Sequence, residues 1–126
     1  MKKDEEINAI DIQLLALIVV LISTGISIAI TYNQKLNLEK KETIFDSKES
    51  FNITLFNRIL ITVLSLVFLY VNIKLYNLSK KEGEDLKSYI LQIIASILAI
   101  ISALIALYVV KLSTNESIVD VENPII

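Results

Sequence analysis

The stretch Asn57–Tyr76, NRILITVLSLVFLYVNIKLY, consists mainly of Ile, Leu, Val and Phe, yet it also contains charged and amide side chains. It belongs to an apolar run over 53–76. At about 1.5 Å per helical residue, this run is long enough to cross the roughly 30 Å hydrocarbon core of a bilayer. Arg58 and Asn72 are costly in lipid unless they face other helices or reach the membrane surface. The fold therefore depends on where these polar side chains point.

Two similar apolar runs, 12–32 and 89–110, lie on either side in the 126-residue chain. The chain is 54% hydrophobic and its mean hydropathy is +0.63, which is high for a soluble domain. We predict an all-α integral membrane protein: one membrane domain with three transmembrane helices in a small left-handed bundle. The other segments are a polar N-terminus (1–11), a polar loop (33–52), a short charged loop (77–88) and an acidic C-terminal tail (111–126).

The loop over 77–88 is short, and Gly83 is its natural turn residue. A connection of this length places consecutive helices side by side in opposite directions. We therefore expect the second and third spans to form an antiparallel hairpin.

Small and polar residues recur in the three runs at alternating steps of three and four residues. This 3.5-residue period is typical of one face of each helix in a left-handed bundle. We call these faces the predicted seams. In the first run the seam is Gln13, Ala16, Val20, Ser23 and Ser27; in the second, Arg58, Thr62, Ser65, Leu69, Asn72 and Tyr76; in the third, Ser88, Gln92, Ala95, Ala99, Ser102 and Ala106.

Helices in lipid associate through close packing of small residues and through interhelical hydrogen bonds. We therefore expect the predicted seams to face one another, with Gly25 allowing a close approach. Antiparallel spans would bring Gln13, Asn72 and Gln92 together as an amide layer near one membrane face. A second layer, at mid-depth, would consist of Ser23 and Ser65 with Ala99 or Ser102. Arg58 lies toward the opposite face, where its long stem can reach the surface.

The composition argues against enzymatic chemistry. The chain has no His and no Cys, no acidic residue occurs inside a span, and no nucleotide-binding, metalloprotease or nucleophile-elbow motif is present. We therefore predict no enzymatic activity and no catalytic, cofactor-binding or metal-binding residues. The net charge of −2 does not suit nucleic acid as a partner.

The orientation in the membrane is not decided by the positive-inside rule, because Lys and Arg divide equally between the two sides. We place the N-terminus in the cytoplasm, because Lys80, Lys81 and Lys87 crowd a very short loop; a dual orientation is the alternative. We expect the run 12–32 to be an uncleaved membrane helix, since it is longer than the apolar core of a signal peptide.

Two functions fit this pattern. The first is a structural, accessory or assembly subunit, whose predicted seams serve helix–helix association within its own bundle or with another membrane protein. The alternative is a homo-oligomeric channel, holin-like pore or small transporter, with the polar stripe of the second span lining the path. The predicted partners are the lipid bilayer and either other copies of the chain or another membrane protein.

Overall fold

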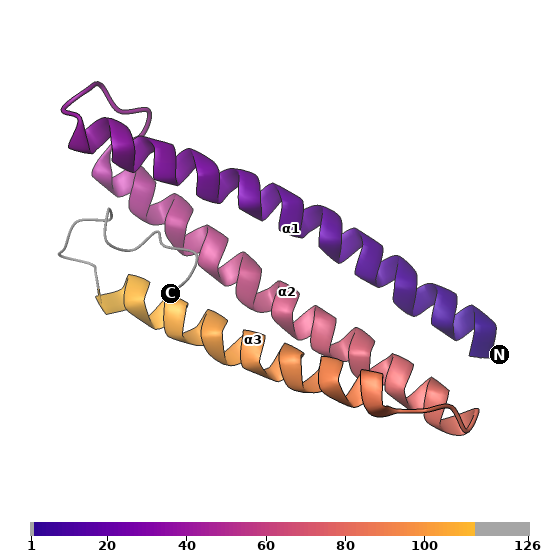
Figure 1. Ribbon diagram of the computed structural model, residues 1–126. Coiled ribbons are helices and arrows are strands. Elements are labelled where there is room, and N and C mark those ends of the chain that lie inside the picture. Colours follow the sequence, from indigo (N-terminus) through magenta and orange to yellow (C-terminus); the bar gives the residue numbers. More distant parts are fainter. Residues whose placement is uncertain (1, 113–126) are drawn as a thin grey trace.

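The computed structural model describes residues 2–112 and is entirely helical over this range. The helices are α1 (Lys2–Leu38), α2 (Ser47–Lys81) and α3 (Lys87–Leu112) (Figure 1). Each is long enough and apolar enough to cross a membrane. The predicted helical class and the three candidate spans are therefore confirmed, whereas most of the predicted C-terminal tail lies outside the described residues.

Each helix is longer than the apolar run that predicted it. α1 begins in the polar N-terminus and continues to Leu38, and α2 already begins at Ser47, so the connector between them covers only 39–46. Lys, Glu and Gln favour helical backbone almost as well as Leu does. The apolar run therefore marks the part of a helix that matches the bilayer, and polar side chains continue the helix where water can solvate them.

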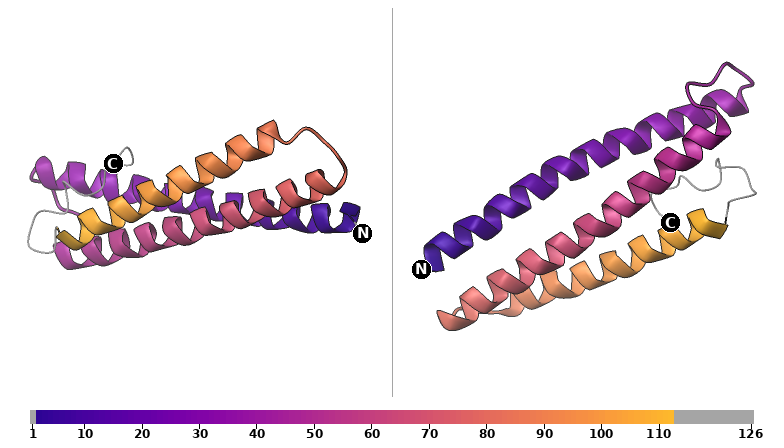
Figure 2. Two further views of the ribbon diagram at one scale, coloured as in Figure 1. Left: turned by 90° about the horizontal axis from the view of Figure 1, so that it is seen from below. Right: turned by 180° about the vertical axis from the view of Figure 1, so that it is seen from behind.

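α2 is the central helix of the bundle (Figure 1 and Figure 2). It packs against both α1 and α3, whereas α1 and α3 make almost no direct contact. The α1–α2 connector lies at one end of the bundle, and the N-terminus and the α2–α3 connector lie at the other (Figure 1). α2 therefore needs two packing faces, and each outer helix needs only one.

Buried positions recur at intervals of seven residues on each helix, and half of those named below are Ala or Ser. They include Ala9, Ala16, Ser23 and Ile30 on α1, Leu64, Val71 and Leu78 on α2, and Ser96, Ala103 and Val110 on α3. Large apolar side chains point outward instead, with exposed fractions of 64% for Leu15, 72% for Leu21 and 61% for Leu98. Small residues inside and large apolar residues outside suit a bundle that has lipid as its solvent.

The helix ends follow local capping rules. α2 begins with a capping box, in which the Asp46 carboxylate accepts from the Glu49 amide at 2.7 Å and the Glu49 carboxylate accepts from the Asp46 amide at 3.3 Å. After α2, Gly83 has a φ of 70°, which confirms it as the turn residue. At the end of α1, Lys40 takes the equivalent position with a φ of 57°.

Asn33 ties the α1–α2 connector back onto α1. Its side-chain carbonyl accepts hydrogen bonds from the backbone amides of Ile44 at 2.8 Å and Phe45 at 2.9 Å. Its amide group donates to the Phe45 carbonyl at 3.2 Å and to the Ser50 hydroxyl at 3.0 Å. These four bonds use the full hydrogen-bonding capacity of an asparagine side chain. The position at which α2 begins against α1 therefore depends on Asn33.

We expect Asn33→Ala to destabilise the bundle by about 1–3 kcal/mol, because it removes the partner of the Ile44 and Phe45 amides and of the buried Ser50 hydroxyl. Asn37→Ala is the matched control, since Asn37 is exposed one turn later on α1. The measurement is the midpoint of unfolding by SDS in mixed micelles. Equal midpoints for the two variants would contradict the role of Asn33.

Candidate functional site

The contact between α1 and α2 is centred on the amide of Asn57, which is 0% exposed. The Ser23 hydroxyl donates to the Asn57 side-chain carbonyl at 2.6 Å, and the Asn57 amide group donates to the Ser27 hydroxyl at 2.9 Å. Ser23 and Ser27 are one turn apart, so both bonds hold α2 at the same level of α1. Both serines belong to the predicted seam of the first span, whereas Asn57 was not predicted.

The contact between α2 and α3 is centred on Asn72. Its amide group donates to the Ser96 hydroxyl at 2.6 Å and to the main-chain carbonyl of Gln92 at 3.4 Å. The Ser96 hydroxyl donates to the same carbonyl at 2.9 Å. The predicted layer of three amide side chains does not form within residues 2–112: Asn72 bonds to the main chain of Gln92, and Gln13 is hydrogen-bonded to neither residue. The reason is that α1 and α3 hardly touch, so a layer across all three helices does not close.

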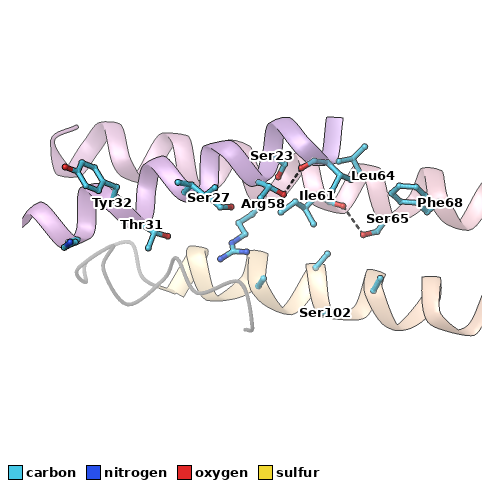
Figure 3. Close-up of a pocket in the computed structure, with 17 residues that line it drawn as sticks. Ser23, Ser27, Thr31, Tyr32, Arg58, Ile61, Leu64, Ser65, Phe68 and Ser102 are labelled. Carbon is cyan, nitrogen blue, oxygen red and sulfur yellow. Dashed lines mark hydrogen bonds between the residues drawn. The ribbon is translucent and has the colours of Figure 1, made fainter. Parts of the chain in front are cut away.

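A groove with a volume of about 750 Å³ lies between α1 and α3, where α2 forms its floor. Figure 3 shows the side chains that line it. Members of all three predicted seams take part: Ser23, Ser27, Arg58, Ser65, Ala99 and Ser102. The structure thus brings the mid-depth residues Ser23, Ser65, Ala99 and Ser102 around one space instead of into direct contact.

The groove is positively charged at one end and apolar at the other. Arg58, whose residue surface is only 6% exposed, extends from α2 toward α3, and Lys35 also contributes to the lining (Figure 3). Among the described residues that line the groove, none is acidic. Leu64 and Phe68 form the apolar part of the floor. The groove is therefore an amphipathic space between the two outer helices.

The remaining polar residues of the α2 seam bond within their own helix. The Thr62 hydroxyl donates to the Arg58 carbonyl and the Ser65 hydroxyl donates to the Ile61 carbonyl, both at 2.9 Å. Such bonds satisfy a hydroxyl in an apolar environment without a second helix. Thr62 and Ser65 therefore do not link helices within this chain.

The predicted seam of α3 requires a correction. Gln92, Ala95, Ala99 and Ser102 are exposed, and the buried line runs one residue later, through Ser96 and Ala103. Of the predicted seam, Ala106 is buried. α3 packs on a single neighbour, so only a narrow line of it is buried, and the bonds of Asn72 to Ser96 and Gln92 select that line. Ala99 and Ser102 face the groove, while Gln92 and Ala95 lie beyond it.

Gly25 also differs from the expectation. It is exposed, and a Cβ placed on it would meet no atom within 4 Å. It lies two residues from both Ser23 and Ser27, which corresponds to a rotation of about 200° around the helix. Because those serines face α2, Gly25 faces away from it and allows no close approach within this chain.

Several buried polar residues escaped prediction: Asn33, Ser50, Thr54, Asn57, Ser79 and Ser96. A usable signal was present, because Ser50, Thr54 and Asn57 are spaced four and three residues apart, next to the predicted seam of α2. Only one polar face per helix was expected, so this second line was overlooked. The Thr54 hydroxyl is fully buried and has no hydrogen-bond partner within the described chain.

No protein family, curated protein or solved structure matches this chain significantly. Within residues 2–112, no three His, Cys, Asp or Glu side chains gather in a way that could hold a metal ion. The candidate site consists of the hydrogen-bond clusters around Asn57 and Asn72 and of the amphipathic groove that Arg58 lines.

We expect Asn57→Ala to lower the free energy of unfolding by about 1–2 kcal/mol, since interhelical hydrogen bonds in membranes contribute about 0.6 kcal/mol each on average and at most about 1.7. Thr54→Val is the control, because Thr54 is buried one turn earlier but its hydroxyl has no partner in the described part. The valine variant should be as stable as the wild type or more so. SDS unfolding checks both variants, and a loss of equal size in each would contradict the role of Asn57.

Proposed function

We propose that the chain is a multi-pass membrane protein without enzymatic activity, which serves as a structural, accessory or assembly subunit. The observation that carries this proposal is the pair of hydrogen bonds between the Asn57 side chain and the hydroxyls of Ser23 and Ser27. An intramembrane asparagine that is fully buried between two helices acts in helix association and does not face a water path. The hydrogen bonds that Asn72 donates to α3 also support a role of polar residues in helix association.

The geometry of the proposed bundle is left-handed, with α2 and α3 as an antiparallel hairpin across the membrane. The seven-residue spacing of buried positions supports the left-handed form, because a heptad repeat keeps facing its partner only when helices wind in that sense. We place the N-terminus in the cytoplasm. The N-terminus and the lysine-bearing α2–α3 connector lie at the same end of the bundle, which supports this orientation (Figure 1).

Small and amide residues that are exposed on α1 and on α3 support association with another membrane protein or another copy of the chain. Gln92 and Ala95 are exposed on α3 outside the groove, and Gly25 is exposed on α1. Small residues let the backbones of neighbouring helices approach closely, and a glutamine side chain can bond across the contact. The surface that this chain does not use internally thus has the composition of a helix–helix interface.

The alternative is a homo-oligomeric channel, holin-like pore or small transporter. One observation favours it: Arg58, Ser65 and Ser102 line a common space. A buried arginine inside a membrane domain is a functional candidate by default. In this reading several copies would join their grooves into a water-filled path.

Single cysteines distinguish these functions, because the chain has no Cys of its own. We expect Ser65→Cys and Ala99→Cys to be unreactive toward a small membrane-impermeant maleimide in native membranes, because the groove opens toward lipid. Asn77→Cys, exposed near the end of α2, is the reactive control. Rapid labelling of both groove positions would show that water fills the groove, and the pore would then replace the accessory subunit as the proposed function.

Bulky substitutions test the surface for a partner. We expect Ala95→Phe to abolish a stoichiometric complex that survives purification in mild detergent, because the added ring would separate the two backbones. Ile97→Phe, also exposed on α3, should leave that complex intact. The measurement is the mass of the purified complex by light scattering. A monomer in the wild type, or equal loss in both variants, would count against the accessory role.

A further inference from the structure

The groove differs from the rest of the outer surface because it is recessed and is also lined by two positively charged side chains. Its α1 side runs from Val20 to Lys35, a length of about 22 Å along the helix axis. Asn57 fixes the level of Arg58 beside Ser27, so Lys35 lies about two turns closer to the end of the bundle. Arg58 and Lys35 thus mark the outer part of the groove, and the apolar lining lies deeper in the membrane.

The outer part has the chemistry of an anion site. Thr31 and Tyr32 add hydroxyl groups to the two cations, and the described lining contains no carboxylate. The guanidinium of Arg58 bends toward the side on which Thr31 lies (Figure 3). Guanidinium has five N–H donors in a planar fork, so it can bind a phosphate in bidentate fashion and keep other interactions.

The deeper part has the chemistry of an acyl-chain site. Ile61, Leu64 and Phe68 form its floor, and Ala99 and Ala103 on α3 leave room above it. A flexible hydrocarbon chain can lie along these apolar side chains, and the Ser65 hydroxyl beside them already bonds to the Ile61 carbonyl. Charge at the membrane surface and a hydrocarbon path beneath it match the two ends of a phospholipid.

The size of the groove favours a lipid over a helix. Its volume of about 750 Å³ falls in the range of roughly 300–1,000 Å³ that small-ligand sites occupy. A transmembrane helix about 10 Å wide and about 30 Å long fills roughly 2,000 Å³. A helix would therefore enter the groove only in part, whereas one acyl chain and a phosphate fit within it.

We propose that this groove binds an anionic phospholipid, with the phosphate on Arg58 and Lys35 and one acyl chain along Ile61, Leu64 and Phe68. Two cations in the lining favour an anionic lipid over a zwitterionic one, which carries its own ammonium group. A bound lipid also fills the space that α1 and α3 leave open and so completes the packing of the bundle. This proposal is independent of whether a protein partner binds elsewhere on the chain.

The test counts lipids that remain bound to the purified protein by native mass spectrometry, with phosphatidylglycerol and phosphatidylcholine of identical acyl chains as probes. We expect phosphatidylglycerol to bind roughly tenfold more tightly, and Arg58→Gln to remove most of that preference. Lys48→Gln is the charge-matched control, because Lys48 is exposed near the same end of the bundle and is outside the lining. Helical circular dichroism checks that each variant folds.

A second pair of variants keeps the charge constant. Ala99→Phe fills the apolar part of the groove and should lower phosphatidylglycerol binding, whereas Leu98→Phe, exposed outside the lining, should not. Lys35→Gln should weaken phosphatidylglycerol binding in part. It tests the same charge requirement if Arg58→Gln does not fold.

Three results would overturn the proposal. The first is equal binding of the two lipids by every variant. The second is displacement of the lipid by millimolar inorganic phosphate, which would identify a plain anion site. The third is a lipid-free dimer that Ala99→Phe disrupts, which would identify a helix of a second copy as the occupant.

Discussion

The hydrogen bonds between Asn57 and the hydroxyls of Ser23 and Ser27 set the register of α1 on α2, and other features of the bundle depend on that register. In lipid, apolar side chains gain little by leaving the solvent for another helix, so their packing alone selects no particular register. A buried amide does select one, because its donors and acceptor must find partners. Asn33 repeats the arrangement at the end of α1 and fixes where the connector folds back.

The number of helices and their apolar parts could be predicted from the sequence, because a bilayer sets the length of apolar chain that spans it. The interior of the bundle was only partly predictable. Within the first predicted seam, Ala16 and Ser23 are buried and Ser23 and Ser27 bond to Asn57, since an outer helix has one packing face and the small residues of α1 lie on it. α2 has two neighbours, and a line of polar residues faces each of them. Because one polar line per helix was expected, only the line that contains Asn72 and faces α3 was predicted.

The face of α3 was displaced by one residue for a related reason. Small residues occur on both candidate lines, Ala95, Ala99 and Ser102 on one and Ser96 and Ala103 on the other. Periodicity alone cannot choose between adjacent lines of equal composition. The choice is made by the bonds of Asn72 to Ser96 and the Gln92 carbonyl, a long-range contact that no local pattern in α3 contains.

The position of Arg58 follows from the same geometry. Consecutive residues on a helix point about 100° apart. Asn57 is directed onto α1, and Arg58, the next residue, lines the groove between α1 and α3. An isolated arginine at mid-membrane costs about 2.5–3.5 kcal/mol on insertion scales, and less toward the surface. Arg58 lies toward the end of the groove that also contains Lys35, where this cost is lower. The hydrogen bonds that hold α1 to α2 thus also create the cationic groove beside them.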